Sequence, residues 1–213
     1  MKRVFLVIAS FVLLISGSFT VASAEDIAGR HGLGIGLGYT FSTPKNVDST
    51  TVPSINYTYG ITSNYSLELS IGRLVTNVKN SGIDVVDVTV MPLQVTGQYR
   101  IPTEAISYYL GACLGYYFNS LDGSKGQNYI RSLGYPDATY KADMDNSFGY
   151  HINIGADLFV NKNLVINLDV RKLWSEADST EKLNIPSIGY SFSAKRKSSL
   201  DTAVAGIGIK YFF

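Results

Sequence analysis

The chain has 213 residues and a formal charge of +1 at neutral pH, and it carries one cysteine beside 15 tyrosines and 10 phenylalanines. A single cysteine excludes an intrachain disulfide framework. A nearly balanced charge offers no basic field that would attract nucleic acid. We therefore expect neither a disulfide-stabilised secreted domain nor a nucleic-acid-binding protein.

The first 24 residues have the order of a secretory signal peptide. Two basic residues come first, an apolar run over 4–15 follows, and an A-x-A triplet at 22–24 offers a cleavage site. The apolar run is shorter than the roughly 20 residues that a membrane-spanning helix needs, so a retained anchor is the weaker alternative. We expect residues 1–24 to be cleaved during export and residues 25–213 to form one domain.

The segment HGLGIGLGYTF, residues 31–41, has glycine at positions 32, 34, 36 and 38 with other residues between them. A dinucleotide-binding fingerprint requires G-x-G-x-x-G, and the third glycine of that motif is missing here. The period of two is instead typical of a β-strand with one apolar face and one small face. The sequence therefore predicts a strand rather than a nucleotide-binding loop.

Seven further segments alternate with the same period, at 53–61, 65–72, 93–101, 108–118, 148–160, 164–171 and 202–213. Some links between segments are short (62–64, 102–105 and 161–163), whereas the others are long (44–50, 76–87, 119–146 and 175–200). A soluble antiparallel sandwich would also alternate, but its links have no reason to sort by end. We predict an all-β fold, an eight-stranded antiparallel transmembrane β-barrel with short periplasmic turns and long extracellular loops.

The small and polar face of each strand is expected to point into the narrow barrel, because the apolar face must meet lipid. The candidate residues of the lumen are Glu68, Ser70, Gln94, Gln98, His151, Asp157, Asp169 and Arg171. One interpretation is a salt-bridged plug, in which Arg171 pairs with Asp169, Glu68 or Asp157. The other is a polar constriction that selects permeants. A plugged and an open barrel have the same alternating sequence pattern, so the pattern does not distinguish these two interpretations.

The spacing of histidine and carboxylate argues against catalysis and metal binding. His151 and Asp157 share one strand face, and at about 3.3 Å per residue they stand roughly 20 Å apart, too far for a dyad. Two separated histidines lack the spacing of a metal site. We expect no enzymatic activity, no metal and no cofactor. A lipid-modifying enzyme is the alternative, and it would need a catalytic triad at the rim, near Ser147 and His151.

Two features of the outer face predict contacts with the membrane. Arg73 and Lys172 have the lipid-facing parity near the extracellular strand ends, where we expect them to meet lipopolysaccharide phosphates, because a charge at mid-bilayer costs about 2–4 kcal/mol. Aromatic residues near the strand ends predict the two interfacial girdles. They are Tyr39, Phe41, Tyr65, Tyr108, Phe118, Phe148, Trp174 and Tyr211.

Four stretches resemble the outer membrane protein W (OmpW) family: MPLQVTGQYRI, SYYLGACLGYYF, DNSFGYHINIGADLFVNKNLVINLDVRKLW and DTAVAGIGIKYFF. The resemblance implies a barrel in the Gram-negative outer membrane. It also implies a narrow channel for small hydrophobic molecules, with lateral release into the membrane. The terminal aromatic residues resemble the signal read by the barrel-assembly machinery, so Phe213 is expected to engage that machinery. The family lumen is described as hydrophobic, whereas the inward face of this chain carries charges.

The sequence leaves two functions open. The first is a narrow channel or binding lumen for small hydrophobic molecules. The second is a closed structural or adhesive barrel whose extracellular loops bind a partner or a surface. A continuous path past the inward charges would distinguish the first from the second.

Overall fold

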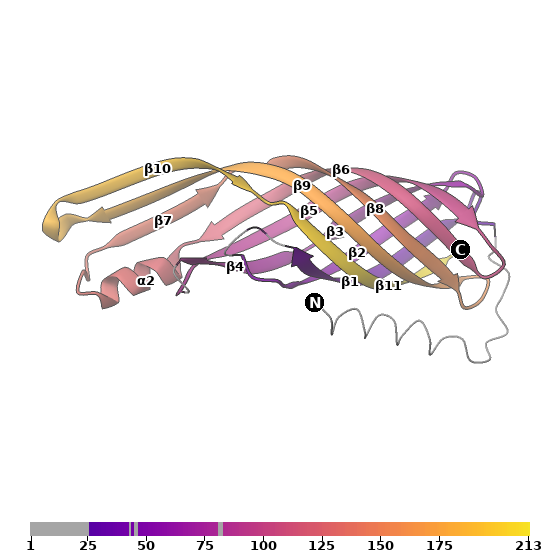
Figure 1. Cartoon of the computed structure of the whole chain (residues 1–213), viewed down its shortest axis with the longest axis horizontal. Coiled ribbons are helices and arrows are strands. Elements are labelled where there is room, and N and C mark those ends of the chain that lie inside the picture. The colour runs from indigo at the N-terminus through magenta and orange to yellow at the C-terminus, as the bar shows by residue number, and fades with distance from the viewer. Residues whose placement is uncertain (1–25, 43, 45–46, 81–82) are drawn as a thin grey trace.

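The computed structural model describes residues 26–42, 44, 47–80 and 83–213, and it is mostly antiparallel β-structure (Figure 1). The expected signal peptide therefore lies outside the described residues. The strands are β1 (His31–Ser42), β2 (Thr51–Gly60), β3 (Tyr65–Gly72), β4 (Leu74–Asn80), β5 (Ile83–Pro102), β6 (Ile106–Asp122), β7 (Thr139–Met144), β8 (Ser147–Phe159), β9 (Leu164–Ile185), β10 (Tyr190–Ser199) and β11 (Thr202–Phe212). The helical elements are α2 (Ser124–Ser132) and the 3-10 turn η1 (Pro186–Ile188). Neither of them combines the length and the apolar character that a membrane-spanning helix requires.

Eight strands close into a ring, as the sequence predicts. They pair in the order β11-β1-β2-β3-β5-β6-β8-β9, and β9 pairs back to β11. In the seam between the first and last strands, Gly36 of β1 lies opposite Gly208 of β11. Closure matters because an unpaired backbone group in lipid costs several kcal/mol, about as much as a lost hydrogen bond in hydrocarbon.

One end of the barrel, here called the turn end, carries the short links and both barrel termini. The other, the loop end, carries the long links. At the turn end, the backbone amide of Phe213 donates to the carbonyl of His31 (2.8 Å). A buried apolar cluster of Ile27, Phe159, Val165 and Phe212 closes the interior there.

The links at the loop end contain more regular structure than the alternation predicts. Much of the range 76–87 belongs to β4 and β5, and α2 and β7 lie within 119–146. Most of 175–200 is a hairpin of β9 and β10, and β7 pairs with the other edge of β9. Figure 1 shows β7, β10 and α2 extending beyond the barrel. The inward faces of these extensions carry few large apolar side chains, since β9 buries Ala177 and Ser179 there and β7 has only three inward positions. The period-two apolar signal by which a strand is recognised in sequence is therefore weak.

The wall is irregular where β3 passes into β4. β2 pairs with β3 up to Ser54 opposite Gly72, and Arg73 then separates β3 from β4. On this side β4 meets the β1–β2 connection, through a bridge between Val47 and Val78. A hydrogen bond from the Lys79 amine to Asp48 (2.8 Å) adds a second contact.

The glycine face points inward and leaves room for large side chains. A Cβ on Gly34 would lie 2.8 Å from Cγ of Lys210. A Cβ on Gly155 would lie 2.3 Å from the ring of Tyr109. Real Cβ atoms do not approach so closely, so these positions require glycine for the lumen side chains to fit.

Aromatic rings gather on the outer face toward both ends of the barrel. At the turn end the ring centroids of Tyr65 and Tyr99 are 5.4 Å apart. Toward the loop end Tyr150 stacks on Trp174 at 5.3 Å. Of the predicted girdle residues, all but Trp174 are strongly exposed on the isolated chain: Tyr39, Phe41, Tyr65, Tyr108, Phe118, Phe148 and Tyr211. An apolar surface of this kind suits contact with lipid.

Candidate functional site

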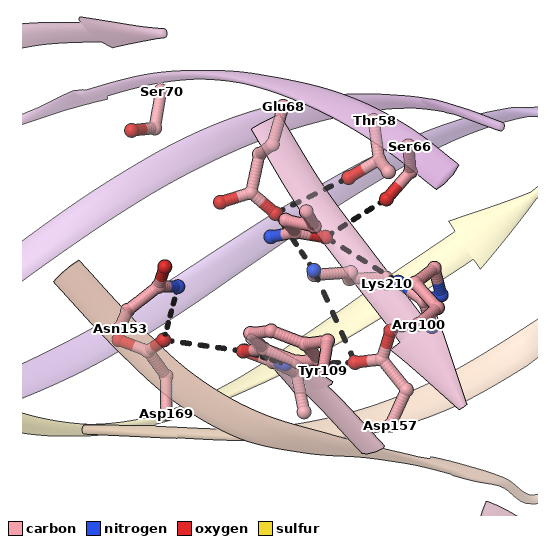
Figure 2. Close-up of polar contacts among 12 residues, drawn as sticks. Thr58, Ser66, Glu68, Ser70, Arg100, Tyr109, Asn153, Asp157, Asp169 and Lys210 are labelled. Carbon is pink, nitrogen blue, oxygen red and sulfur yellow. Dashed lines mark hydrogen bonds and ion pairs between the residues drawn. The ribbon is translucent and has the colours of Figure 1, made fainter. Parts of the chain in front are cut away.

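Four charged side chains from four strands meet inside the turn-end half of the lumen (Figure 2). Lys210 Nζ lies 2.7 Å from Glu68 Oε2 and 3.9 Å from Asp157 Oδ1. Arg100 Nη2 lies 2.5 Å from Asp157 Oδ2. All four are buried. We call Glu68, Arg100, Asp157 and Lys210 the plug, because together they bridge β3, β5, β8 and β11 across the interior.

Tyr109 and Asn167 connect the plug to a second ion pair. The amide of Asn167 donates to Asp157 Oδ1 (2.7 Å) and to the Tyr109 hydroxyl (2.9 Å). The Tyr109 hydroxyl donates in turn to Asp169 Oδ2 (3.2 Å). The other oxygen of Asp169 accepts from Arg171 Nε at 2.6 Å. Every acid in this network therefore has a cation, which is the condition under which buried charge persists.

The three acids of this site are among the residues predicted from the sequence, whereas two of its bases are not. The structure brings Arg171 to Asp169, one of the three predicted partners. Glu68 and Asp157 instead meet Lys210 and Arg100, which were not among the candidates. The predicted lumen residues include three acids but only one base, Arg171. That excess of buried negative charge is the sequence signal that two further inward bases should be present.

The other candidates form a smaller network nearer the loop end. The amide of Gln94 donates to the Tyr117 hydroxyl (3.0 Å), and its oxygen accepts from Ser70 (3.4 Å). His151 Nδ1 lies 3.4 Å from Gln94 Nε2. The remaining candidate, Gln98, lies beside the plug instead, where its side-chain oxygen accepts hydrogen bonds from Ser66 and from Arg100.

The arrangement at the rim does not assemble a catalytic triad. The Ser147 hydroxyl bonds to Ser175 (3.0 Å) and Asn119 (3.1 Å), whereas His151 bonds to Gln94. Within residues 26–42, 44, 47–80 and 83–213, no three histidine, cysteine or acidic side chains are grouped to hold a metal ion.

Two neighbouring cavities, which share part of their lining, lie above the plug. The lumen cavity, of about 90 Å³, has a polar part formed by Ser54, Asn56, Glu68, Ser70, Gln94, Asp169 and Arg171. The vestibule, of about 290 Å³, opens at the loop end and has an apolar part formed by Val47, Val78, Val86, Val88, Val90, Leu121 and Met144. Both cavities are lined by Leu74, Val90, Tyr117, Leu173 and Thr202. The vestibule also has a polar part, which includes Asp48, Thr76 and Glu181, so its apolar residues form one side of the mouth above the charged base.

The two cations predicted to contact lipopolysaccharide, Arg73 and Lys172, both lie on the outer face of the wall. Arg73 is exposed at the break between β3 and β4, and its amide donates to the carbonyl of Pro53 (3.1 Å). Lys172 lies on β9 between Ile152 of β8 and Ala203 of β11, and it is half-buried.

Comparisons with known proteins agree with this architecture. The family model described as OmpW family matches residues 13–213. The crystal structure of the outer membrane protein OprG from Pseudomonas aeruginosa superposes with a TM-score of 0.70 and 18% identity, covering 92% of this chain and 99% of OprG. At that identity the likeness shows the fold alone.

Two curated relatives are similar in sequence. The uncharacterized outer-membrane protein y4mB of Sinorhizobium fredii is 27% identical over 168 residues, covering 76% of this chain and 66% of y4mB. The dibenzothiophene metabolism operon protein PahQ of Pseudomonas aeruginosa is 27% identical over 130 residues, covering 60% of this chain and 53% of PahQ. The chain thus spans less than two thirds of the length of either relative.

Proposed function

This chain belongs to the OmpW family of outer-membrane β-barrels, and we propose that it takes up small hydrophobic molecules through the vestibule. The observation that carries the proposal is the cluster of valine and leucine side chains on one side of the vestibule, above a base that is closed by paired charges. An apolar solute gains about 25 cal/mol for each Å² of apolar surface that it removes from water. The vestibule offers that gain at the outer surface, which is the side a nutrient reaches first.

The plug makes lateral release the favoured exit for such a solute. Axial passage would require opening buried ion pairs, and removing one partner of such a pair costs about 3–5 kcal/mol. The vestibule is bounded on one side by β4 and the β1–β2 connection, including Val47 and Val78, where the wall is irregular. Because this part of β4 lies loopward of Arg73, a solute that leaves there emerges at the height of the lipopolysaccharide and then partitions into the lipid. The name of PahQ, which places that relative in an operon for an aromatic compound, is compatible with this substrate class.

Binding of naphthalene to the barrel in lipid nanodiscs tests the proposal. Val88 is buried in the vestibule, so Val88→Asp should weaken binding at least tenfold, and the nearly isosteric Val88→Thr should weaken it less. Ser193→Asp on exposed β10 introduces the same charge outside the cavity and should bind as the wild type does. Equal binding by Val88→Asp and the wild type would reject the vestibule as the site.

A disulfide across the irregular wall tests the exit. Val47 and Val78 are bridge partners on antiparallel segments, and such pairs suit the Cα separation of a disulfide. Oxidation of the Val47→Cys/Val78→Cys variant should lower naphthalene uptake into proteoliposomes at least fivefold, and reduction should restore it. Uptake that is indifferent to oxidation would argue for another path.

The second candidate function, an adhesive barrel, is favoured by the shape of the loop end. The hairpin of β9 and β10 extends beyond the vestibule and exposes Ile188, Tyr190 and Phe192 at its tip. Deleting 186–192 should abolish binding to a surface partner under this function and leave naphthalene binding unchanged.

We also propose that Phe213 engages the barrel-assembly machinery. Its ring stacks on that of His31 but is still 59% exposed, so most of the side chain is accessible for recognition. Deletion of Phe213 should reduce the folded barrel in cells severalfold and leave refolding of the purified chain in detergent unchanged. A parallel loss in both assays would mean that Phe213 acts through stability instead.

A further inference from the structure

We infer that Arg171 binds the carboxylate of an amphipathic ligand whose apolar body lies in the vestibule. This inference rests on the proposed function, because it requires the vestibule to be occupied by a small apolar group. It goes further by assigning the ligand a class, a compact monocarboxylate, and by placing its charged end in the lumen cavity.

Arg171 differs from the cations of the plug in that its guanidinium remains accessible from the lumen cavity. Its side chain is 25% exposed, whereas that of Arg100 is 1% exposed. Only Nε donates to a protein acceptor, Asp169 Oδ1 at 2.6 Å, in the described part of the chain. The two η nitrogens are therefore available to a ligand, and Arg171 lines the lumen cavity, which shares part of its lining with the vestibule.

Thr202 provides an independent donor on the path between the two cavities. It is 5% exposed, it lines both cavities, and its hydroxyl has no hydrogen-bond partner among the described residues. On the barrel wall Thr202 lies opposite Leu173, one inward position closer to the loop end than the pair of Val204 and Arg171. A buried hydroxyl without a partner is costly, and a ligand oxygen at this position would satisfy it.

The chemistry of the guanidinium selects a planar anion. Arginine presents parallel N–H groups that match the two oxygens of a carboxylate, and with Nε already engaged the η nitrogens supply such a pair. Glu68 lines the same cavity but is neutralised by Lys210 at 2.7 Å, and Asp169 is shared by Arg171, Tyr109 and Asn153. The ligand carboxylate is therefore bound by the η nitrogens of Arg171, and its binding does not require a net positive charge in the lumen.

The apolar body of the ligand would point toward the loop end. Leu74, Val90, Tyr117 and Leu173 line both the lumen cavity and the vestibule, and they pack in one apolar cluster between the two. A ligand anchored at Arg171 therefore passes an apolar collar before it reaches the valines above. Neutral hydrocarbons use the vestibule alone, so the same barrel would bind a carboxylate more tightly than the hydrocarbon of equal size.

Binding of 2-naphthoate and naphthalene to the full barrel in nanodiscs separates the two proposals. The wild type should bind 2-naphthoate at least tenfold more tightly than naphthalene. Arg171→Gln should remove that preference and leave naphthalene binding unchanged, and Thr202→Val should reduce the preference about threefold. Lys172→Gln, which removes a cation from the outer face of the same strand, is the matched control and should change neither affinity.

Each outcome decides between the proposals. Naphthalene binding without preference for the carboxylate, or a preference that survives Arg171→Gln, overturns the Arg171 site and leaves the proposed function standing. Binding of neither probe overturns both. If Arg171→Gln does not fold, Arg171→Lys decides, since lysine retains the charge beside Asp169 but lacks the paired N–H groups. A carboxylate affinity that falls at least threefold in Arg171→Lys supports the site, and an unchanged affinity rejects it.

Discussion

In the turn-end half of the interior, charged side chains from opposite walls satisfy one another, as Lys210 does with Glu68 and Arg100 with Asp157. In the loop-end half, the inward positions of β5 carry Val86, Val88 and Val90, and a cavity remains between them and the facing wall. The same β-strand period thus produces a filled base and an open mouth. Ion pairs fill space by reaching across the lumen, whereas short branched side chains do not reach across it.

The largest effect is expected from breaking the base. Arg100→Ala leaves Asp157 with the neutral amide of Asn167 (2.7 Å) and with Lys210 at 3.9 Å as its nearest cation, so we expect a loss of about 3–5 kcal/mol in unfolding free energy. Urea unfolding in lipid vesicles measures it. Single-channel recordings should show a silent wild type, a silent Arg171→Ala variant, and openings in Arg100→Ala.

The control for that experiment is Lys125→Ala, which breaks the exposed ion pair with Asp87 near α2 (2.6 Å). An exposed pair of this kind contributes about 0–1 kcal/mol. If Arg100→Ala were no more destabilising than Lys125→Ala, or if Arg171→Ala alone opened a channel, the closed base would have been assigned to the wrong residues.

A smaller effect should follow from overfilling the base. Gly155→Ala places a methyl group 2.3 Å from the ring of Tyr109, so the network between Asp157 and Asp169 must shift. Overpacking of this kind costs about 1–3 kcal/mol. Gly97→Ala is the matched control, because a Cβ there meets nothing within 4 Å. Equal unfolding midpoints for both variants would show that the plug region accommodates the added methyl group without loss of stability.

The outer-face cations, Arg73 and Lys172, lie on the wall between the turn end and the loop end. We propose that Arg73 and Lys172 bind lipopolysaccharide phosphates at this level, and Arg73→Leu should then lower the lipopolysaccharide that co-purifies with the barrel by about two- to threefold. Lys182→Leu on the extended part of β9, which is exposed above the barrel, is the control. Unchanged co-purification in Arg73→Leu would remove the proposal.

The smallest effect is expected above the vestibule, where Asp137 ties the β7 segment to η1. Partial burial alone would raise the pKa of Asp137. Hydrogen bonds from the Ser187 amide and hydroxyl (2.5 and 2.9 Å) lower it by more, so the pKa of Asp137 lies below its usual value. A carboxyl whose pKa is depressed on folding stabilises the fold above its unfolded pKa of about 3.9, and that contribution is lost as pH falls through the folded value.

Hydrogen exchange at the Ser187 amide should therefore accelerate below about pH 3.9 in the wild type, after correction for intrinsic rates. Asp137→Asn should exchange faster at neutral pH and show no such step. A wild-type amide with the same protection at pH 2 and pH 6 would contradict the assignment. Binding of naphthalene should not change in this variant, because Asp137 does not line the vestibule.

The sequence by itself determined the wall of this protein. Alternation at period two, short turns such as 62–64 and an exposed apolar face specify eight strands and their inward sides, and the ring confirms them. A shift of one residue would move every apolar side chain into the lumen, so the pattern leaves little freedom in register.

Only the tertiary structure decided what meets across the lumen and above the membrane. Arg100 is far from Asp157 in the chain, and Lys210 is far from Glu68. Each pair forms because its two residues lie at the same height along the barrel axis on different strands. That height is set by the stagger of the closed ring, which no local pattern records. The hairpin of β9 and β10 is likewise hard to recognise from periodicity, because its buried positions include the small residues Ala177 and Ser179 and show no run of large apolar side chains.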